Sequence, residues 1–192
     1  MRLLPLPDGG LRLRFDRDEA QLLEHLVGQL ISLLQSHSST ALDPDPLFAS
    51  LEVGGTDELP EDPALARLFP DAFEAPGEAS EFRRVTEQGL VNRKLQDALD
   101  VTNALGLGGE PGGGEEAEES PVEATIISAT MPAWVRTLTA LRLAMAARLG
   151  IERDEDHVRM LADEESRGTV MVYDWLGAIL DSILRMVSEE SE

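Results

Sequence analysis

Apolar side chains recur every three to four residues along four long stretches of the chain, a spacing typical of amphipathic helices that pack around a core. The clearest stretch follows Asp16 and Asp18, either of which can cap the first turn of a helix. Its apolar stripe is too broad for a helix that stands alone in water, so other elements must cover it. The stripe comprises Leu22, Leu23, Leu26, Val27, Leu30, Ile31, Leu33 and Leu34.

The same spacing predicts further long helices over residues 80–105, 130–150 and 169–188. For the second of these, Thr130 can serve as the cap, and Gly150 ends the helix. We expect the helix over residues 80–105 to bury one side against the core. The residues that mark that side are Phe82, Val85, Leu95, Ala98, Leu99, Thr102 and Leu105.

Shorter elements are predicted between the long helices. Asp45-Pro46 and Asp62-Pro63 each place an acid at the cap and a proline at the first position of a short helix. Residues 154–161 predict a short acidic helix, and residues 122–128 contain a short extended segment. Residues 2–4 and 11–15 either pair as a β hairpin or form an irregular arm.

These elements predict a mainly α fold, in which four principal helices and several short ones form a bundle with a small N-terminal β hairpin. The length of 192 residues fits one helical domain over residues 1–192. Residues 106–120 are rich in glycine and glutamate, and we expect a disordered linker inside the domain there.

The charge of the chain narrows the choice of partners. It carries 16 basic and 37 acidic residues, for a net charge of −21. Such a surface repels phosphate backbones and anionic membranes, so we expect no strong direct binding to nucleic acid and no membrane attachment. It favours a basic protein partner instead. No apolar run approaches the length of a membrane span, and the expected location is the cytoplasm.

No motif for catalysis, metal binding or cofactor binding is found. The chain has no cysteine, which excludes disulfides, thiolate zinc sites and a thiol switch. His25, His37 and His157 do not pair at helical spacing, and glutamates rather than lysine follow the glycine-rich run of residues 106–114. We therefore assign no catalytic residue, no metal ligand and no cofactor.

Arginines beside apolar residues are the remaining candidates for a site. A buried arginine needs a partner, and the nearby carboxylates can supply an internal ion-pair network that fixes helix register. Alternatively, the arginines receive an acidic element from another protein. Trp175 is either half-buried packing or an interface anchor. The candidate partners of the arginines are Asp71, Glu81, Glu87 and Asp174. The candidate partner-binding residues are Arg67, Arg83, Arg84, Glu87, Arg142, Asp174 and Trp175.

Several short sequence motifs, in their order along the chain, resemble those of an actinobacterial family of oxidative-stress regulators, the AosR family, which is also known as a domain of unknown function. The resemblance implies a cytoplasmic helical protein that acts in transcriptional control through a sigma factor or RNA polymerase. A redox-sensing member would use a cysteine pair near its N-terminus, which this chain lacks, so it responds through a partner or has a constitutive role. The motifs are Asp62-Pro63 with Arg67-Leu68, Pro70-Asp71-Ala72, Glu81-Phe82-Arg83-Arg84 with Thr86-Glu87, Trp134 with Leu141-Arg142-Leu143-Ala144, Arg148-Leu149-Gly150, and Val172-Tyr173-Asp174-Trp175-Leu176-Gly177.

The leading hypothesis is a non-enzymatic regulatory protein that works by protein–protein contact. One alternative is a small cytoplasmic enzyme with an unrecognised arginine–carboxylate site. The other is a purely structural homodimer, in which the last helix pairs with its copy. A deep pocket with a bound metabolite would favour the enzyme, and a shallow apolar or arginine-rich groove would favour the regulator.

Overall fold

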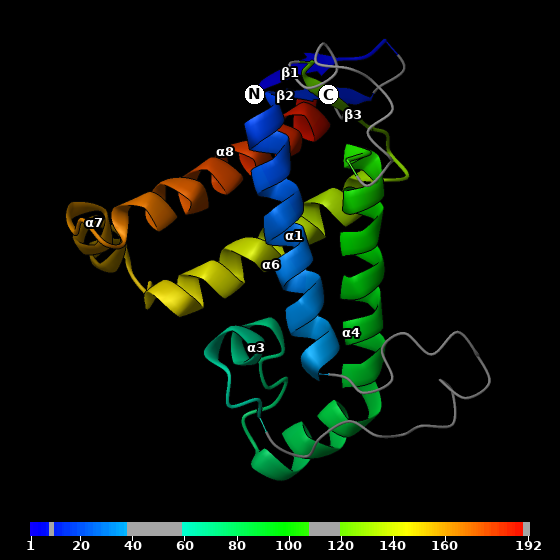
Figure 1. Cartoon of the computed structure of the whole chain (residues 1–192). Helices are drawn as coiled ribbons and strands as arrows, with labels where there is room; N and C mark the ends of the chain where they lie inside the picture. Colours follow the sequence, from blue (N-terminus) through cyan, green and yellow to red (C-terminus); the bar gives the residue numbers. More distant parts are fainter. Residues whose placement is uncertain (8–9, 38–58, 108–119, 190–192) are drawn as a thin grey trace. The chain divides into compact units, whose positions relative to one another are not determined.

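The fold is mainly α with a small antiparallel sheet, as predicted, in a computed structural model that describes residues 1–7, 10–37, 59–107 and 120–189 (Figure 1). The four predicted long helices are present as α1, α4, α6 and α8. The predicted short helix after Asp45-Pro46 and most of the predicted linker lie outside the described residues, and the single domain stays a prediction. The elements are β1 (Arg2–Pro5), β2 (Leu11–Phe15), α1 (Arg17–His37), α3 (Pro63–Leu68), α4 (Pro76–Leu105), β3 (Val122–Ile126), α6 (Met131–Leu149), α7 (Asp154–Ala162) and α8 (Arg167–Glu189).

The three strands form one antiparallel sheet in the order β1-β2-β3. The predicted hairpin is therefore confirmed, and β3 adds a strand on the other side of β2. In β2 the apolar residues Leu11, Leu13 and Phe15 are buried, and the arginines between them are not. This alternation is what a strand with one face on the core requires.

The chain divides into two compact units. Unit 1 comprises residues 1–31, 96–141 and 175–192, and unit 2 comprises residues 32–95 and 142–174. Among the described residues, no helix is both long enough and apolar enough to cross a membrane.

The sheet and parts of all four long helices supply the core of unit 1. Trp134 of α6 is 1% exposed, and Phe15 of β2 meets the ring of Trp175 edge to face, with 6.4 Å between the ring centres. Apolar burial of this kind is the main stabilising contribution to such a unit. The fully buried members of the core include Leu13, Leu23, Ile126, Trp134, Leu138, Leu176, Ile179 and Ile183.

Two helices of unit 2 begin or end at the residues that the sequence predicted. Asp62 caps α3, because its Oδ1 accepts hydrogen bonds from the backbone N–H groups of Ala64 and Leu65 at 2.8 and 3.2 Å. Gly150 ends α6 with a φ of +68°, a left-handed conformation that glycine adopts without strain.

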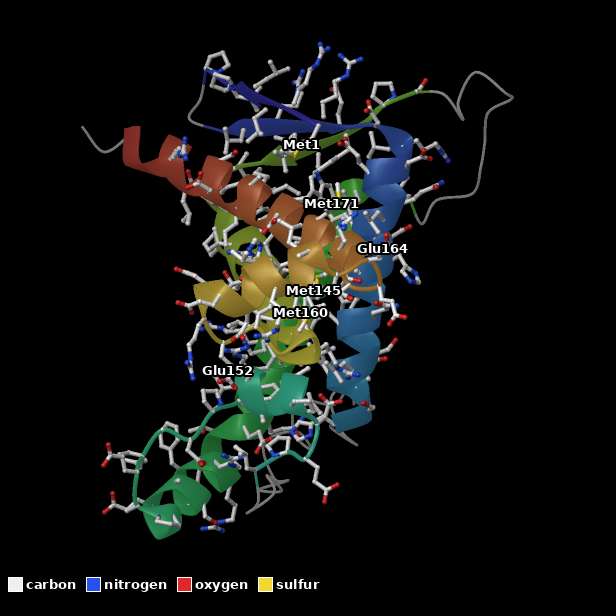
Figure 2. All side chains as sticks on the ribbon, turned by 90° about the vertical axis from the view of Figure 1, so that its left-hand side faces the viewer. Met1, Met145, Glu152, Met160, Glu164 and Met171 are labelled. Carbon is white, nitrogen blue, oxygen red and sulfur yellow. The ribbon has the colours of Figure 1, made fainter. Side chains whose placement is uncertain are left out.

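α7 is the least buried helix of unit 2, and none of its residues is buried. Val158 on α7 is 65% exposed and Met171 on α8 is 60% exposed. The chain before and after α7 is also exposed, at Glu152 and Glu164 (Figure 2). These residues provide surface positions at which a substitution leaves the core untouched.

The buried side of α4 differs from the predicted one within unit 2. Phe82 and Val85 were expected inside, but they are 43% and 66% exposed. The buried residues of α4 instead recur at i, i+4 spacing, in a row that lies one position after Phe82. The charged residues Arg83 and Glu87 therefore occupy the side where apolar residues were expected. The members of the row are Ala79, Arg83, Glu87, Val91 and Leu95.

Candidate functional site

The buried row of α4 places two opposite charges one helical turn apart. Arg83 is 6% exposed and Glu87 is 4% exposed. A buried charge is destabilising by several kcal/mol, roughly, unless it is paired and hydrogen-bonded. The partners of these two side chains therefore decide what this part of unit 2 can do.

Arg83 is paired with Asp71 in the segment after α3. Its Nη2 donates a hydrogen bond to Oδ1 of Asp71, whose side chain is 48% exposed. One end of the pair is thus buried and the other reaches solvent. Asp71 was among the carboxylates expected to serve the arginines, and the pair fixes the chain at residues 70–72 on α4.

Glu87 is held on one oxygen by a histidine. Its Oε1 pairs with Nε2 of His37, the last residue of α1. The ring of His37 stacks on the ring of Phe69, with 5.5 Å between ring centres. Nζ of Lys94 also lies over the Phe69 ring, 5.7 Å from its centre. These contacts place a histidine and a cation on one aromatic ring, and the histidine also holds the carboxylate of Glu87.

The second oxygen of Glu87 is buried and, among the described residues, has no hydrogen-bond partner. Buried carboxylate oxygens usually accept at least one hydrogen bond, because burying one without a partner is costly. Oε2 is therefore an acceptor to which an N–H or O–H group from outside the described residues can donate.

A hollow of about 250 Å³ lies beside these pairs, entirely within unit 2. Phe82 and Leu90 of α4 line it and are 43% and 45% exposed. Phe73 packs edge to face on Phe82, with 5.5 Å between ring centres, and is itself 46% exposed. The lining residues are Leu68, Phe69, Pro70, Asp71, Ala72, Ala79, Phe82, Arg83, Thr86, Glu87 and Leu90.

The hollow and its rim are what the sequence did not predict. His37, Phe73 and Leu90 were not among the candidate residues. The available signal was the i, i+4, i+8 spacing of Phe82, Thr86 and Leu90, which places them on the side of α4 next to Arg83 and Glu87. We call the hollow, with Phe73, Phe82 and Leu90 around it, the aromatic hollow.

The structure brings only two of the seven candidate partner-binding residues, Arg83 and Glu87, to the aromatic hollow. Arg84 is on the same helix and exposed, but it does not line the hollow. Arg67 of α3 donates to the backbone oxygen of Ile151 at 2.9 Å, which is a structural contact.

The other three candidates lie on α6 and α8. The guanidinium of Arg142 lies 4.4 Å from the ring centre of Tyr173. Asp174 is exposed and bonds to Nε2 of His157 at 2.8 Å. Trp175 belongs to unit 1, where it packs on Phe15.

Internal ion pairs account for several of the other arginines. Arg148 donates to Oδ2 of Asp62 at 2.7 Å, and Arg136 pairs with Asp97. Within the described ranges, no group of three histidines and carboxylates could hold a metal ion. The aromatic hollow offers one buried acceptor, one ion pair that is buried at its arginine end and an apolar rim, which is the composition of a contact surface.

Over residues 1–187 the chain matches the model of a family described as "Domain of unknown function (DUF2017)". It is also similar to a protein of Mycobacterium leprae (strain TN) named "Putative oxidative stress regulator AosR". The two are 28% identical over 182 residues, which cover 86% of this chain and 77% of the relative. No solved structure matches the chain.

Proposed function

Since the chain belongs to the DUF2017 family, we propose that it is a non-enzymatic regulatory protein that acts in transcriptional control by binding another protein. The name of the M. leprae relative, which describes an oxidative stress regulator, supports a regulatory role. We further propose that it works in the cytoplasm, on a sigma factor or on RNA polymerase.

The observation that carries this proposal is the aromatic hollow. Phe73 and Phe82 each leave nearly half of their surface in water, at 46% and 43% exposure, although they contact each other. Aromatic side chains around a hollow are typical anchors of protein–protein interfaces, because they bury a large area with little loss of conformational entropy. We assign the contact surface to this hollow.

The chemistry of the partner follows from the charges. Arg83 is already paired with Asp71, so an acidic element of the partner is not needed there. Oε2 of Glu87 has no hydrogen-bond partner among the described residues and can accept a hydrogen bond, and the net charge of −21 attracts a basic surface. We propose a partner segment with an apolar side chain for the rim and an arginine, lysine or amide N–H for Glu87.

A thiol switch has no place in the proposal, because the chain contains no cysteine. If the protein responds to oxidants through a thiol, that thiol belongs to its partner. The surface proposed for the contact uses only aromatic, aliphatic and charged side chains.

The test is a tagged pull-down from the native cell, with the double variant Phe73→Ala/Phe82→Ala beside the wild-type chain. Both rings are half-exposed at the rim, so the variant is expected to keep its helical circular dichroism spectrum. RNA polymerase or a sigma factor should be recovered with the wild-type chain and lost with the variant. A variant of Arg83 is a poor choice, because that side chain is buried and paired.

The matched control is Val158→Ala/Met171→Ala, which removes two exposed apolar side chains away from the hollow. It should recover the transcription component as the wild-type chain does. Absence of any transcription component from the wild-type pull-down would contradict the proposed partner. Equal loss in both double variants would contradict the assignment to the hollow. A light-scattering mass twice that of one chain, unchanged in Phe73→Ala/Phe82→Ala, would favour the homodimer instead.

A further inference from the structure

A second surface stands out because its charge is opposite to that of the whole chain. The chain has a net charge of −21, yet residues 2–17 contain four arginines, Arg2, Arg12, Arg14 and Arg17, and two acids. Three of these arginines lie on the adjacent strands β1 and β2. This surface belongs to unit 1, and its interpretation does not depend on the function proposed for unit 2.

The pairing of the strands brings the arginines together on one face of the sheet. Arg2 lies directly opposite Arg14, and Leu4 lies opposite Arg12. Leu11, Leu13 and Phe15 point into the core, so the arginines that alternate with them lie on the outer face. Like charges directly opposite each other destabilise a strand pair, which makes Arg2 and Arg14 an arrangement that folding alone does not favour.

Compensation from acidic groups on this face is weak. Across β1, β2 and β3 the one acidic residue is Glu123. It approaches Nε of Arg12 and of Arg14 at 3.8 and 3.9 Å, and all three side chains are 43–45% exposed. At these distances and exposures the ion pairs contribute little, so the guanidinium groups keep most of their capacity to bind an anion.

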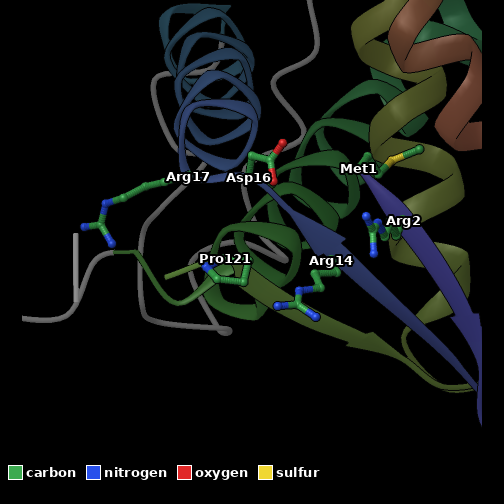
Figure 3. Close-up of a pocket in the computed structure, with 6 residues that line it drawn as sticks. All are labelled: Met1, Arg2, Arg14, Asp16, Arg17 and Pro121. Atoms are coloured by element: carbon green, nitrogen blue, oxygen red, sulfur yellow. The ribbon is translucent and has the colours of Figure 1, made fainter. Parts of the chain in front are cut away.

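The sheet edge is also hollowed next to these arginines. A hollow of about 540 Å³ is lined by Met1, Arg2, Arg14, Asp16, Arg17 and Pro121. Figure 3 shows Arg2 and Arg14 on neighbouring strands and Pro121 beside Arg14, whereas the side chain of Arg17, at the start of α1, points away from both arginines. Three of the six lining residues carry a guanidinium, and one, Asp16, carries a carboxylate.

We propose that this hollow binds a compact anion with two or more phosphoryl groups, held by the guanidinium groups of Arg2 and Arg14. Guanidinium is planar and presents paired N–H donors that match phosphate oxygens, so two arginines beside one hollow suit a diphosphate better than a single charge. A volume of about 540 Å³ accommodates a ligand of nucleotide size.

A compact anion fits this surface better than a nucleic acid strand does. At physiological ionic strength the field of a charge fades over about 8 Å, so an anion inside the hollow feels mainly the nearby arginines. A long polyanion would extend past them and meet the acidic remainder of a chain whose net charge is −21.

The experiment is isothermal titration of the full chain with inorganic pyrophosphate at low salt, with adenosine diphosphate as a second probe. Arg2→Gln/Arg14→Gln should weaken pyrophosphate binding at least about tenfold, because it removes charge-assisted hydrogen bonds. The control Arg159→Gln/Arg185→Gln removes two arginines whose side chains are 61% and 74% exposed, and it should change the affinity less than about twofold.

A further variant distinguishes a lost site from a damaged fold. Glu123→Gln removes the one carboxylate from the outer face of the sheet, and it should tighten pyrophosphate binding. An unfolded variant cannot bind more tightly than the wild-type chain.

Three results would overturn the proposal. The first is no binding of pyrophosphate at millimolar concentration. The second is equal weakening in the control variant. The third is binding of single-stranded oligonucleotides that tightens with their length, which would assign the surface to a nucleic acid backbone instead.

Discussion

Arg136 of α6 donates two hydrogen bonds to the carboxylate of Asp97 on α4, from Nε at 2.6 Å and from Nη2 at 2.7 Å. The carboxylate is buried, at 8% exposure, and the arginine is 46% exposed. These hydrogen bonds hold the pKa of the Arg136 guanidinium above its usual value, so the arginine stays charged throughout the physiological range.

The first prediction is that Arg136→Met lowers the free energy of unfolding by about 2 kcal/mol, because it leaves a buried carboxylate without its cation. The double variant Arg136→Met/Asp97→Asn should lose less than the sum of the two single variants. Urea unfolding of all four chains gives the coupling energy. Additive losses would show that the two hydrogen bonds contribute nothing specific to stability.

Substitution by alanine should change the stability of the chain in opposite directions at two glycines that have open space around them. Gly150 has a φ of +68°, and a Cβ there meets nothing within 4 Å. Gly150→Ala should therefore destabilise the chain by about 1 kcal/mol through backbone strain alone. Gly89 lies inside α4, also with nothing within 4 Å, and Gly89→Ala should stabilise by up to about 1 kcal/mol. Thermal unfolding of both variants checks the sign, and two shifts of the same sign would contradict the explanation.

The N-cap of α3 should contribute more to the free energy of unfolding than the ion pair that Asp62 forms with Arg148. Asp62 accepts from two backbone N–H groups through Oδ1 and from Arg148 through Oδ2 at 2.7 Å. We expect Asp62→Ala to lower the free energy of unfolding by about 1–2 kcal/mol, because buried helix donors lose their acceptor. Arg148→Met removes the exposed ion pair alone and should lower it by less than about 1 kcal/mol. Chemical unfolding separates the two, and an equal loss would assign the effect to the ion pair.

The start of α7 should give a local dependence on pH. The backbone N–H of Glu152, with Arg159 and the backbone of Arg153, holds the pKa of the Asp156 carboxyl below its usual range. Since the folded pKa is the lower one, the stabilisation is present above the unfolded pKa, at about pH 4, and is lost as the pH falls through the folded pKa.

An NMR titration of Asp156 should therefore show a midpoint below that of an aspartate in an unfolded peptide. Asp156→Asn should reduce stability near neutral pH, and its difference from the wild-type chain should shrink under acid conditions. A normal midpoint, or a difference that does not change with pH, would show that these hydrogen bonds do not form in solution.

Local signals predicted most of the fold. The proline after Asp62 marks the start of α3, Gly150 marks the end of α6, and the alternation of Leu11, Leu13 and Phe15 marks β2. Each is a property of the residue at its own position and does not depend on which elements lie beside it.

The aromatic hollow could not be predicted in the same way. A helix rotated about its axis by one residue buries Arg83 in place of Phe82. This rotation is tolerated when Asp71 and His37, from elsewhere in the chain, pair with the buried charges of the helix. Hydropathy alone assigns the phenylalanine to the core, because it does not register these distant partners. Of the candidate residues, Arg83 and Glu87 line the hollow. For the other candidates, the apolar spacing along the chain does not indicate which side chains contact one another in the fold.

The distribution of tryptophan gives unit 1 an optical label of its own. Both tryptophans, Trp134 and Trp175, belong to unit 1, and the one tyrosine of the chain, Tyr173, belongs to unit 2 beneath the guanidinium of Arg142. Red-edge excitation selects indole fluorescence, so it follows the packing of unit 1 alone, whereas the far-ultraviolet circular dichroism of the helices follows both units. Without any added dye, one denaturation series can therefore report whether the two units melt together or in sequence.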